Sequence, residues 1–293
     1  MKNSKLRGGV LRRLLALALS GMLLLGSLVI AAQAAPATPG FPADAVLTRV
    51  YVEGEEVLAG ECVIMDSITY VPLRNFCNLF ADCAITWNGS TNTATVKTAD
   101  LTLTAQSNAL YITANGHSYY TVGRVRNLDG HLYVPIRPLA RSFALDLTWN
   151  STARAVELEY EGERRAVEAA SYDADELYWL SRIISAEAKG EPFLGQIAVG
   201  NVVLNRVRSP LYPNTIYGVI FDRKHGTQFS PVSFGTIYNK PSASAVIAAK
   251  ICLEGYSISD SALFFLNPRI ATNNWIVKNR PYAFTVGNHD FYN

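Results

Sequence analysis

The chain has 293 residues, of which 49% are hydrophobic and 17% charged, so it can build ordinary apolar cores in more than one domain. Five of its 26 basic residues and none of its 24 acidic residues precede position 14, so the formal net charge of +2 hides a balance of −3 in the remainder. Without a Lys/Arg cluster, this composition excludes nucleic acid as a partner recognised by charge. Attachment to an anionic surface would need specific contacts.

Residues 1–34 predict an export signal. Basic residues precede an apolar run from Leu14 to Ala32, and Ala32-Gln33-Ala34 is a small-x-small cleavage site. The run also fits an uncleaved membrane anchor, so a membrane contact is expected only if the signal is retained. We therefore expect an exported protein of the extracellular space or cell wall, with residues 35–45 as a linker.

The four cysteines are too few for a disulfide scaffold. Cys77 and Cys83 are close enough in sequence to form a bridge in an oxidising compartment, but Cys62, Cys77, Cys83 and Cys252 also fit buried free thiols. The sequence has no CxxC pair and no HExxH, and its four histidines are scattered. It therefore predicts neither a metal site nor a cofactor.

An internal repeat occupies the segment from Val46 to Tyr160. The motif Tyr70-Val71-Pro72-Leu73-Arg74 recurs 63 residues later as Tyr133-Val134-Pro135-Ile136-Arg137, and Trp87 recurs as Trp149. Each unit predicts three strands joined by tight turns, a short helix, a strand that carries the Trp and a closing strand. The expected turns are Glu53-Gly54, Asp66-Ser67, Asn115-Gly116 and Asp129-Gly130; the expected helices span 75–81 and 138–144; the closing strands span 93–97 and 155–160.

This pattern resembles the copper amine oxidase N-terminal-like, or stalk, domain, here over residues 46–162. The name does not imply copper, since the segment has no paired His spacing. We expect a spacer or a module that attaches the protein to the cell wall. Its repeated aromatic residues are expected mainly in the core, although they could stack on sugar rings; they are Tyr70, Trp87, Tyr133 and Trp149. A charged run then marks a linker over 163–172.

A carboxylate interrupts the apolar face of the first helix predicted after this linker. The helix is expected from Ala174 to Lys189, and its stripe of Leu177, Leu180 and Ile184 leads to Glu187 at the next position. Partial desolvation there would raise the pKa of Glu187, as a general acid working near neutral pH requires. The alternative is a helix-end Glu turned to solvent.

Two helix-breaking residues separate Glu187 from the next acid, Glu191. Gly190 predicts the end of the first helix, and Pro192 predicts the start of the next one, over 193–208. Glu191 is then placed to cap this second helix, whereas Glu187 is held by the first.

The second helix carries small and polar residues as well as an apolar face. Gly200 allows a neighbouring element to approach closely, and Asn205 and Arg206 are expected to bind carbonyls or a carboxylate rather than substrate. A third helix is expected over 242–254, after a loop over 212–241.

Five blocks in order resemble the cell wall hydrolase family of the spore-cortex-lytic enzyme SleB, over nearly all of residues 173–293. They are A-E-A-K-G-E-P, G-Q-I-A-V-G-N-V-V-L-N-R-V, Q-F-S-P-V, F-L-N-P and G-N-H-D-F-Y. The resemblance implies a mostly helical fold like that of lysozymes and lytic transglycosylases. It also implies an enzyme that cleaves the glycan strands of peptidoglycan with one essential Glu, which by position is Glu187. The expected whole is an α+β multidomain protein, with a duplicated small α+β stalk-like module before a mostly α catalytic domain.

A single acid favours a lytic transglycosylase, because hydrolysis of a glycoside normally uses two carboxylates. Glu187 would protonate the oxygen between N-acetylmuramic acid (MurNAc) and N-acetylglucosamine (GlcNAc). It would then take the proton of the muramic C6 hydroxyl, leaving a 1,6-anhydro-muramic end. The alternatives are a muramidase-type hydrolase that uses water and a non-catalytic wall-binding protein. A peptide-stem amidase is disfavoured, because it would need a zinc triad or a Cys–His pair.

Neutral side chains should contact the substrate, since sugars offer hydroxyl groups, amides and apolar ring faces. The candidates are Gln228, Phe229, Ser230, Tyr238 and Asn267. Each could instead serve loop structure or core packing. The expected partner is peptidoglycan, bound by a monomer; the sequence leaves open whether this is spore cortex or vegetative wall.

Overall fold

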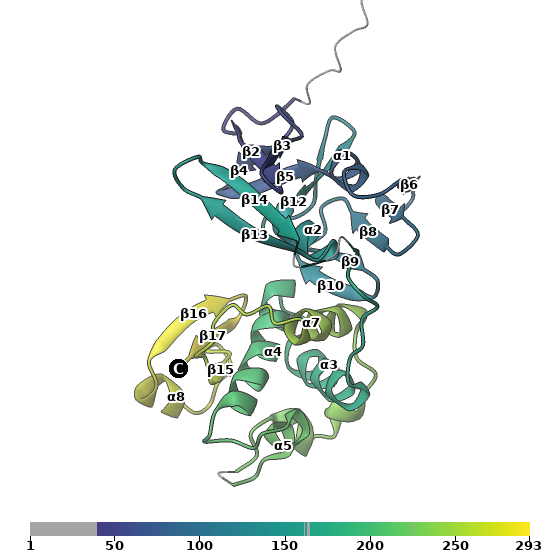
Figure 1. Ribbon diagram of the computed structural model, residues 1–293. Coiled ribbons are helices and arrows are strands. Elements are labelled where there is room, and N and C mark those ends of the chain that lie inside the picture. Colours follow the sequence, from purple (N-terminus) through teal and green to yellow (C-terminus); the bar gives the residue numbers. More distant parts are fainter. Residues whose placement is uncertain (1–39, 161, 163–164, 225) are drawn as a thin grey trace, which may run out of the picture. The chain divides into compact units, whose positions relative to one another are not determined.

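The computed structural model describes residues 40–160, 162, 165–224 and 226–293 (Figure 1). The predicted signal, residues 35–39 of the first linker, part of the second linker and His225 lie outside the described residues. Strands and two short helices make up the first region, residues 46–160, and most of the helices lie in the second region, residues 174–292. Both regions belong to one unit of contacts, residues 38–293. No helix in the described ranges is long and apolar enough to span a membrane.

The first region contains three sheets. The first has the order β1 (Val46–Leu47), β4 (Val63–Met65), β5 (Ile68–Pro72), β12 (His131–Pro135), β11 (Arg126–Leu128). The second has the order β10 (His117–Tyr120), β9 (Tyr111–Ala114), β8 (Thr102–Gln106), β7 (Thr93–Lys97), β6 (Ala84–Asn88). The third has the order β13 (Leu145–Asn150), β14 (Ala155–Tyr160), β2 (Arg49–Val52), β3 (Glu55–Val57).

The two copies of the repeated motif meet at the centre of the first sheet. Strands β5 and β12 run antiparallel, with Val71 opposite Val134, Tyr70 opposite Pro135 and Pro72 opposite Tyr133. Val71 and Val134 are equivalent positions of the repeat, so each motif pairs with its own copy about a local two-fold axis. The two tyrosine side chains are 0% and 1% exposed and fill the core beside this axis.

The expected hairpin turns are present. At Asn115 and Gly116 the φ angles are 47° and 89°, and at Glu53 and Gly54 they are 51° and 80°. Positive φ at both central residues is the conformation of a type I′ turn, which matches the twist of the flanking strands. The Asn-Gly and Glu-Gly pairs therefore form the connections predicted for them.

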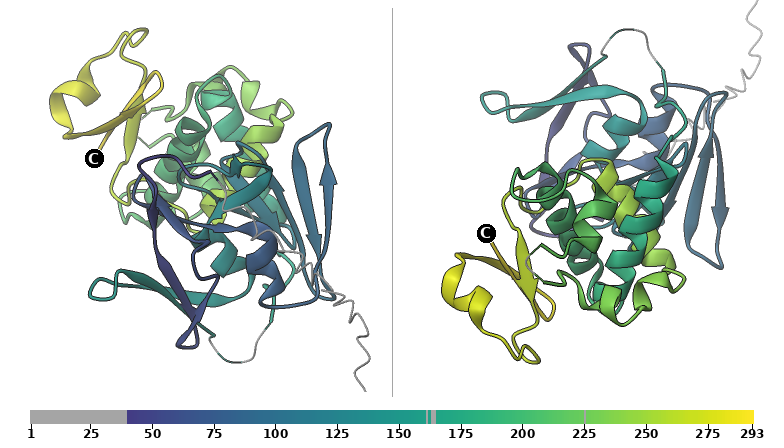
Figure 2. Two further views of the ribbon diagram at one scale, coloured as in Figure 1. Left: turned by 90° about the horizontal axis from the view of Figure 1, so that it is seen from above. Right: turned by 90° about the horizontal axis from the view of Figure 1, so that it is seen from below.

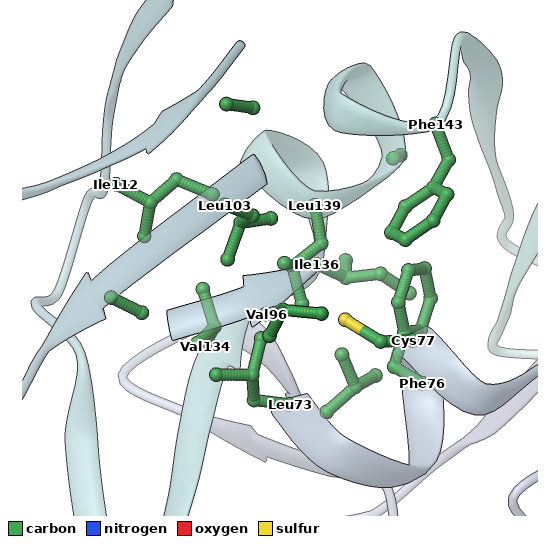
Figure 3. Close-up of a cluster of buried hydrophobic side chains, with 14 of the residues drawn as sticks. Leu73, Phe76, Cys77, Val96, Leu103, Ile112, Val134, Ile136, Leu139 and Phe143 are labelled. Carbon is green, nitrogen blue, oxygen red and sulfur yellow. The ribbon is translucent and has the colours of Figure 1, made fainter. Parts of the chain in front are cut away.

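Short helices follow both central strands and pack into the core of the first region. They are α1 (Leu73–Asn78) and α2 (Ile136–Ser142), each starting two residues before its predicted start, directly after a proline. Leu73, Phe76 and Cys77 of α1 lie against side chains that follow the second copy of the motif, including Leu139 and Phe143 (Figure 3). All four cysteines are free, and three of them are buried.

The two tryptophans of the repeat correct an expectation. Trp87 and Trp149 are 51% and 46% exposed, whereas core positions were expected for the repeated aromatic residues. Their strands, β6 and β13, are each at the edge of a sheet. An edge strand has a neighbour on one side only, so its side chains can remain open to solvent.

The second region confirms the three predicted helices, with ends that differ by at most one residue: α3 (Ala174–Ala188), α4 (Phe193–Arg208) and α7 (Ala243–Leu253). Shorter elements occupy the expected loop and the C-terminal segment: α5 (Ile216–Phe221), α6 (Ser230–Ser233), the 3₁₀ helix η1 (Thr236–Tyr238) and α8 (Trp275–Asn279). A small sheet has the order β15 (Phe264–Leu266), β17 (His289–Tyr292), β16 (Tyr282–Val286). This sheet, drawn in yellow, lies beside the green helices in every view, and β15 and β16 contact α4 (Figure 2).

Gly200 marks the point where three helices approach most closely. A Cβ atom on Gly200 of α4 would lie 2.7 Å from Sγ of Cys252 in α7 and 2.8 Å from Cδ1 of Ile184 in α3. Real Cβ atoms essentially never come so close to other heavy atoms. The close approach expected at this glycine is therefore present.

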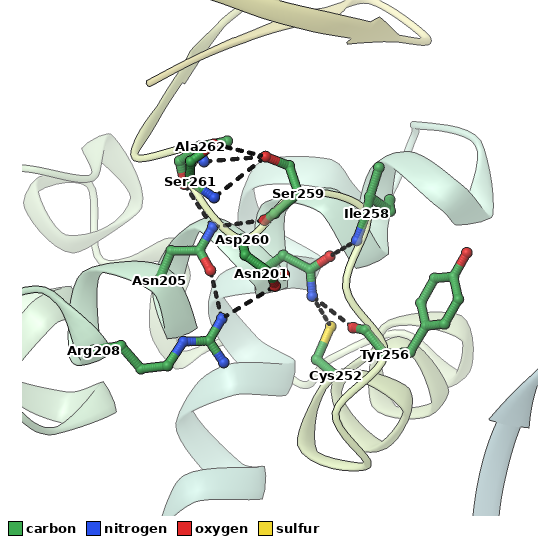
Figure 4. Close-up of polar contacts among 10 residues, drawn as sticks. All are labelled: Asn201, Asn205, Arg208, Cys252, Tyr256, Ile258, Ser259, Asp260, Ser261 and Ala262. Carbon is green, nitrogen blue, oxygen red and sulfur yellow. Dashed lines mark hydrogen bonds and ion pairs between the residues drawn. The ribbon is translucent and has the colours of Figure 1, made fainter.

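Buried amides of α4 fix the chain segment between α7 and β15 (Figure 4). Asn201 donates from Nδ2 to the carbonyl of Tyr256 at 2.9 Å and accepts from the backbone N–H of Ile258 at 2.9 Å. Asn205 donates to the carbonyls of Ser259 and Ala262 at 2.8 and 2.9 Å. Asn205 thus has the structural role expected for it, because buried amides require such partners.

We expect Gly200→Ala to lower the free energy of unfolding by about 1–3 kcal/mol, because the added methyl group overpacks the junction of three helices. Denaturant unfolding of the full chain measures this change. In the matched control, Gly190→Ala, the new Cβ would meet nothing within 4 Å, so unchanged or slightly raised stability is expected. Equal stability of Gly200→Ala and the parent chain would contradict the close packing of these helices.

Candidate active site

The helix α3 places Glu187 at the end of its buried face. Asp173 begins the helix by accepting hydrogen bonds from the backbone N–H groups of Asp175 and Glu176 at 2.9 Å each. Along the face that follows, Leu180 and Ile184 are 0% exposed. Glu187 is half-buried, so the desolvation predicted from its position on the stripe is present.

Burial raises the pKa of Glu187 from 4.5 to about 7, and the positive charge of Arg206 opposes this rise. No hydrogen bond from a described residue contributes to the shift. Desolvation penalises the carboxylate, so the proton stays bound up to neutral pH. Glu187 is therefore a group that can both give and take a proton near pH 7.

Arg206, in the last turn of α4, is the cation that acts on Glu187. Its side chain is 5% exposed, and its Nε donates to the carbonyl of Leu263 at 2.8 Å. The guanidinium lies 5.1 Å from the ring centres of Tyr212 and Phe229 and 5.6 Å from that of Phe264. Its Nη1 is buried without a hydrogen-bond partner in the described part of the chain.

The contact of Arg206 with a carbonyl was expected from the sequence, but its effect on Glu187 was not. Burial lowers the pKa of Arg206, whereas Tyr212, Asp222 and Glu187 raise it. The guanidinium stays charged because its reference pKa is so high. The apolar periodicity of α4 gave no signal of this effect, since it depends on how α3 and α4 cross.

Glu191 forms a different interaction from the predicted helix cap. Its carboxylate accepts from the backbone N–H of Asn288 at 2.8 Å and from Nδ2 of Asn288 at 3.1 Å, and α4 has no side-chain cap. Burial acts to raise the pKa of Glu191, but these hydrogen bonds and the charge of His289 lower it overall. Glu191 is thus a carboxylate at neutral pH and does not duplicate Glu187.

Glu254 is also committed elsewhere. Its carboxylate lies 2.6 Å from Nδ1 of His117, accepts the hydroxyl hydrogen of Tyr172 at 2.5 Å and lies 3.5 Å from Nη2 of Arg141. These contacts join the end of α7 to the first region. Three further acids that follow Glu187 in the sequence have partners too: Asp222 accepts from the backbone of Lys224, Asp260 lies 4.0 Å from Arg208, and Asp290 accepts from Thr285.

The five proposed substrate contacts occupy different surroundings. Phe229 is 2% exposed and packs against Arg206 and, at 6.4 Å, the ring of Phe265, so it supports the cation rather than presenting a free ring face. Gln228 and Asn267 are half-buried and bind backbone groups of Gly226 and Arg269, and Ser230 is exposed at the start of α6. No hydrogen bond joins these residues to the Glu187 carboxylate within the described residues.

Tyr238 belongs to an aromatic group that the sequence did not reveal. It is 61% exposed, and its ring centre lies 6.3 Å from that of Trp179 in α3. Tyr217 and Phe221 of α5 lie 5.3 and 5.1 Å from Trp179. The signal that could have located α5 is Thr215, which caps it by accepting from the N–H of Gly218 at 3.0 Å.

No group of three or more His, Cys, Asp or Glu residues is placed to hold a metal ion in the described ranges. Two cavities in these ranges, of about 400 and 260 Å³, are lined mainly by residues of the first region and not by Glu187.

Comparison with protein families identifies both regions. Residues 190–292 match the Cell Wall Hydrolase family, and residues 51–164 match the Copper amine oxidase N-terminal domain family. The first match begins three residues after Glu187, so the argument for Glu187 rests on its position and surroundings.

Spore cortex-lytic enzymes are among the curated relatives. The protein from Bacillus subtilis (strain 168) is 38% identical over 120 residues, which is 41% of this chain and 38% of that protein. The protein from Bacillus cereus is 38% identical over 120 residues, 41% of this chain and 45% of that protein. This chain thus spans less than half the length of either relative.

A solved structure of the catalytic domain of the germination-specific lytic transglycosylase SleB from Bacillus anthracis is 36% identical. The match covers 42% of this chain and 98% of that chain, with a TM-score of 0.39.

The raised pKa of Glu187 predicts a pH-dependent stability. The folded chain holds the proton of Glu187 more tightly than the unfolded chain, so the unfolding free energy falls as pH rises from about 4.5 to about 7. Glu187→Gln removes this effect and should exceed the parent in stability at pH 8 by about 1–3 kcal/mol. Denaturant unfolding at pH 4.5 and pH 8 measures the difference. The control Glu191→Gln should instead be less stable than the parent at pH 8, since the pKa of Glu191 is lowered in the fold. Equal stability of the parent and Glu187→Gln at pH 8 would refute the burial argument.

Removing the charge of Arg206 should raise the pKa of Glu187 further, because that charge favours the carboxylate. We expect Arg206→Met to shift the titration of the Glu187 carboxyl group upward in NMR spectra of the chain labelled with ¹³C at Glu side chains. Arg206→Lys, which keeps the charge, should titrate close to the parent. The control Arg208→Met removes a largely exposed cation two residues away and should leave the titration unchanged. An unshifted Glu187 titration in folded Arg206→Met would exclude the interaction.

Proposed function

Because residues 190–292 form a domain of the cell wall hydrolase family, preceded by a copper amine oxidase N-terminal domain, we propose that this chain is an exported enzyme that cleaves the MurNAc–GlcNAc bonds of peptidoglycan. The observation that carries the proposal is Glu187, a half-buried acid whose pKa of about 7 suits proton donation at neutral pH. The relatives named for spore cortex lysis support the choice of polymer. The role is lysis of spore cortex during germination or remodelling of the vegetative wall.

The proposed reaction is that of a lytic transglycosylase. Protonated Glu187 gives its proton to the bridging oxygen as the bond from that oxygen to C1 of the muramic residue breaks, and GlcNAc leaves as an alcohol. The Glu187 carboxylate then takes the proton of the muramic C6 hydroxyl, whose oxygen bonds to C1. A 1,6-anhydro-muramic end results, Glu187 is protonated again and no water is consumed.

Arg206 supports the second half of this cycle. Between the two steps Glu187 is a carboxylate in a poorly solvated place, and the fixed positive charge of Arg206 lowers the energy of that state. Because Arg206 and Glu187 form no direct ion pair, the acid still holds its proton near pH 7. One residue can therefore serve as acid and then as base.

A muramidase-type hydrolase is the main alternative, since water could attack C1 in place of the C6 hydroxyl. It normally needs a second carboxylate near the first. Glu191 and Glu254 each have another partner, Asn288 and His117 respectively. A non-catalytic wall-binding protein is the second alternative, against which the raised pKa of Glu187 argues.

Tyr238 and Trp179 are proposed to contact sugar rings of the substrate. Trp179 precedes Glu187 by eight residues on α3, or about 12 Å along the helix axis, roughly the length of a disaccharide. Aromatic side chains suit the apolar faces of sugars. Gln228, Ser230 and Asn267 are proposed to bind N-acetyl and hydroxyl groups, with Phe229 holding Arg206 behind them.

The finer organisation is also a proposal. Residues 1–34 are an export signal, 35–45 a linker, 46–162 a module that arose by duplication, 163–172 a second linker and 173–293 a lysozyme-like catalytic domain. The antiparallel pairing of equivalent residues in β5 and β12 supports the duplication. The protein is proposed to act as a monomer in the cell wall, with the first module attaching it.

Digestion of purified peptidoglycan, followed by mass spectrometry of the products, tests the proposed reaction. The parent chain should release 1,6-anhydro-muramic ends, at a rate that falls as pH rises through about 7, because protonated Glu187 is the reactive form. Glu187→Gln should lose at least about 10³-fold in rate, since no other acid replaces the proton donor. Glu176→Gln, at an exposed position of the same helix, is the matched control and should keep full activity.

The other outcomes decide between the alternatives. Reducing muramic ends in place of anhydro ends would identify a hydrolase. Unchanged turnover by Glu187→Gln would refute the assigned acid, and wall binding by the parent without any product would identify a binding protein.

A further inference from the structure

The Arg and the Trp of the internal repeat are exposed in both units. The Tyr, Val and Pro residues of the motif lie in the central strand pair, but the side chains of Arg74 and Arg137 are exposed and form no hydrogen bond or ion pair with another described residue. Trp87 and Trp149 are also exposed. A single exposed Trp needs no explanation, but its recurrence at equivalent positions of both units does.

Each Trp lines a cavity together with the Arg of its own repeat unit. Trp87 and Arg74 line a cavity of about 260 Å³, and Trp149 and Arg137 line one of about 400 Å³. The apolar walls correspond as well, through the pairs Pro72 and Pro135, Leu73 and Ile136, and Ile85 and Leu147.

The other repeat unit supplies a further part of each wall. Residues 130–132 line the Trp87 cavity, and the equivalent residues 67–69 line the Trp149 cavity. This exchange follows from the pairing of β5 with β12, because each strand is bordered by the chain of the opposite unit. These parts of the two cavities are therefore related by the same local two-fold axis as the motifs. The Trp149 cavity is also lined by side chains near β10 and in the second region: Ser118, Tyr119, Tyr120, Val122, Ile251, Glu254 and Tyr256.

Both cavities contain an indole, apolar walls and one guanidinium without an ion-pair partner among the described residues. Arg74 is the one permanently charged side chain among the described residues that line the Trp87 cavity. In the Trp149 cavity, Arg141 and Glu254 lie 3.5 Å apart and offset each other, which leaves Arg137. An indole suits the apolar face of a sugar ring, and a guanidinium binds a carboxylate through two parallel hydrogen bonds.

We propose that Trp87 with Arg74 and Trp149 with Arg137 form two related binding sites for the muramic units of a peptidoglycan strand, with the indole against the sugar ring and the guanidinium on a carboxylate of the attached peptide. The choice of polymer rests on the proposed function. The volumes of about 260 and 400 Å³ lie just below and in the lower part of the range of about 300–1,000 Å³ for small-molecule sites, so each cavity suits one sugar unit. Two such sites on one chain hold a repeating polymer more tightly than either alone, because the second contact forms at a high effective concentration.

A sedimentation assay with purified peptidoglycan stripped of teichoic acids tests the two sites. The full chain carrying Glu187→Gln is used, so that the polymer is not consumed. Trp87→Ala and Trp149→Ala should each weaken binding by about tenfold or more, since either change ends the bivalent contact. The double variant should bind more weakly still, through the second region alone. The double variant Arg74→Gln/Arg137→Gln should also bind less. Leu47→Ala, at a residue 59% exposed and outside both cavities, is the control and should bind like the parent.

Parental binding by a double Trp variant with an unchanged melting temperature would overturn the proposal. Binding restricted to walls that retain teichoic acids would overturn it too, in favour of a phosphate polymer. The proposed function is judged separately, from products released by the chain with Glu187 intact. Binding without products would overturn the enzyme and leave the two sites standing.

Discussion

The second region depends on one electrostatic constraint: a carboxyl group and a guanidinium share a poorly solvated space without forming a direct ion pair. Burial raises the pKa of Glu187 to about 7, and Arg206 limits that rise. A direct ion pair would hold Glu187 as a carboxylate at neutral pH and remove its use as a proton donor. Without Arg206, the carboxylate that forms after proton transfer would have no charge to stabilise it. The absence of a direct ion pair therefore allows Glu187 to hold its proton near pH 7.

The polar residues of α4 bind one continuous stretch of chain, which includes the carbonyl group that Arg206 contacts. Asn201 and Asn205 hold the segment 256–262, and Arg206 holds the carbonyl of Leu263 that follows it. The same stretch continues into β15, whose Phe264 lies against the guanidinium. These side chains interrupt an otherwise apolar helix, and among the described residues of α4 the buried side-chain atoms without a hydrogen-bond partner are Oε1 of Gln196 and Nη1 of Arg206. The helix α4 therefore fixes the segment 256–263 through its amides, and the carbonyl of Leu263 in that segment in turn orients the guanidinium of Arg206.

How much the sequence predicts depends on the range of the interaction. The helices α3, α4 and α7 and the buried position of Glu187 follow from periodicity within one element, and the structure agrees with them closely. Contacts between distant segments are not encoded in this way, so the sequence missed Asn288 as the partner of Glu191 and Arg206 as the charge near Glu187. The exposed tryptophans were missed for a related reason: strand order, which makes β6 and β13 edge strands, is a property of the whole sheet.

The first region shows why a repeat is informative beyond the fold that it builds. Residues repeated for packing, such as Tyr70 and Tyr133, are buried beside the two-fold axis, so their recurrence is explained by the core. The Arg and Trp positions recur without such an explanation and meet in two related cavities. After the N-terminal basic segment, the chain has a net charge of −3. Its overall charge therefore cannot hold it to an anionic wall, and attachment needs cationic side chains at defined places. Arg74 and Arg137 are placed to meet that requirement, each beside an aromatic ring that would limit binding to sugars of matching shape.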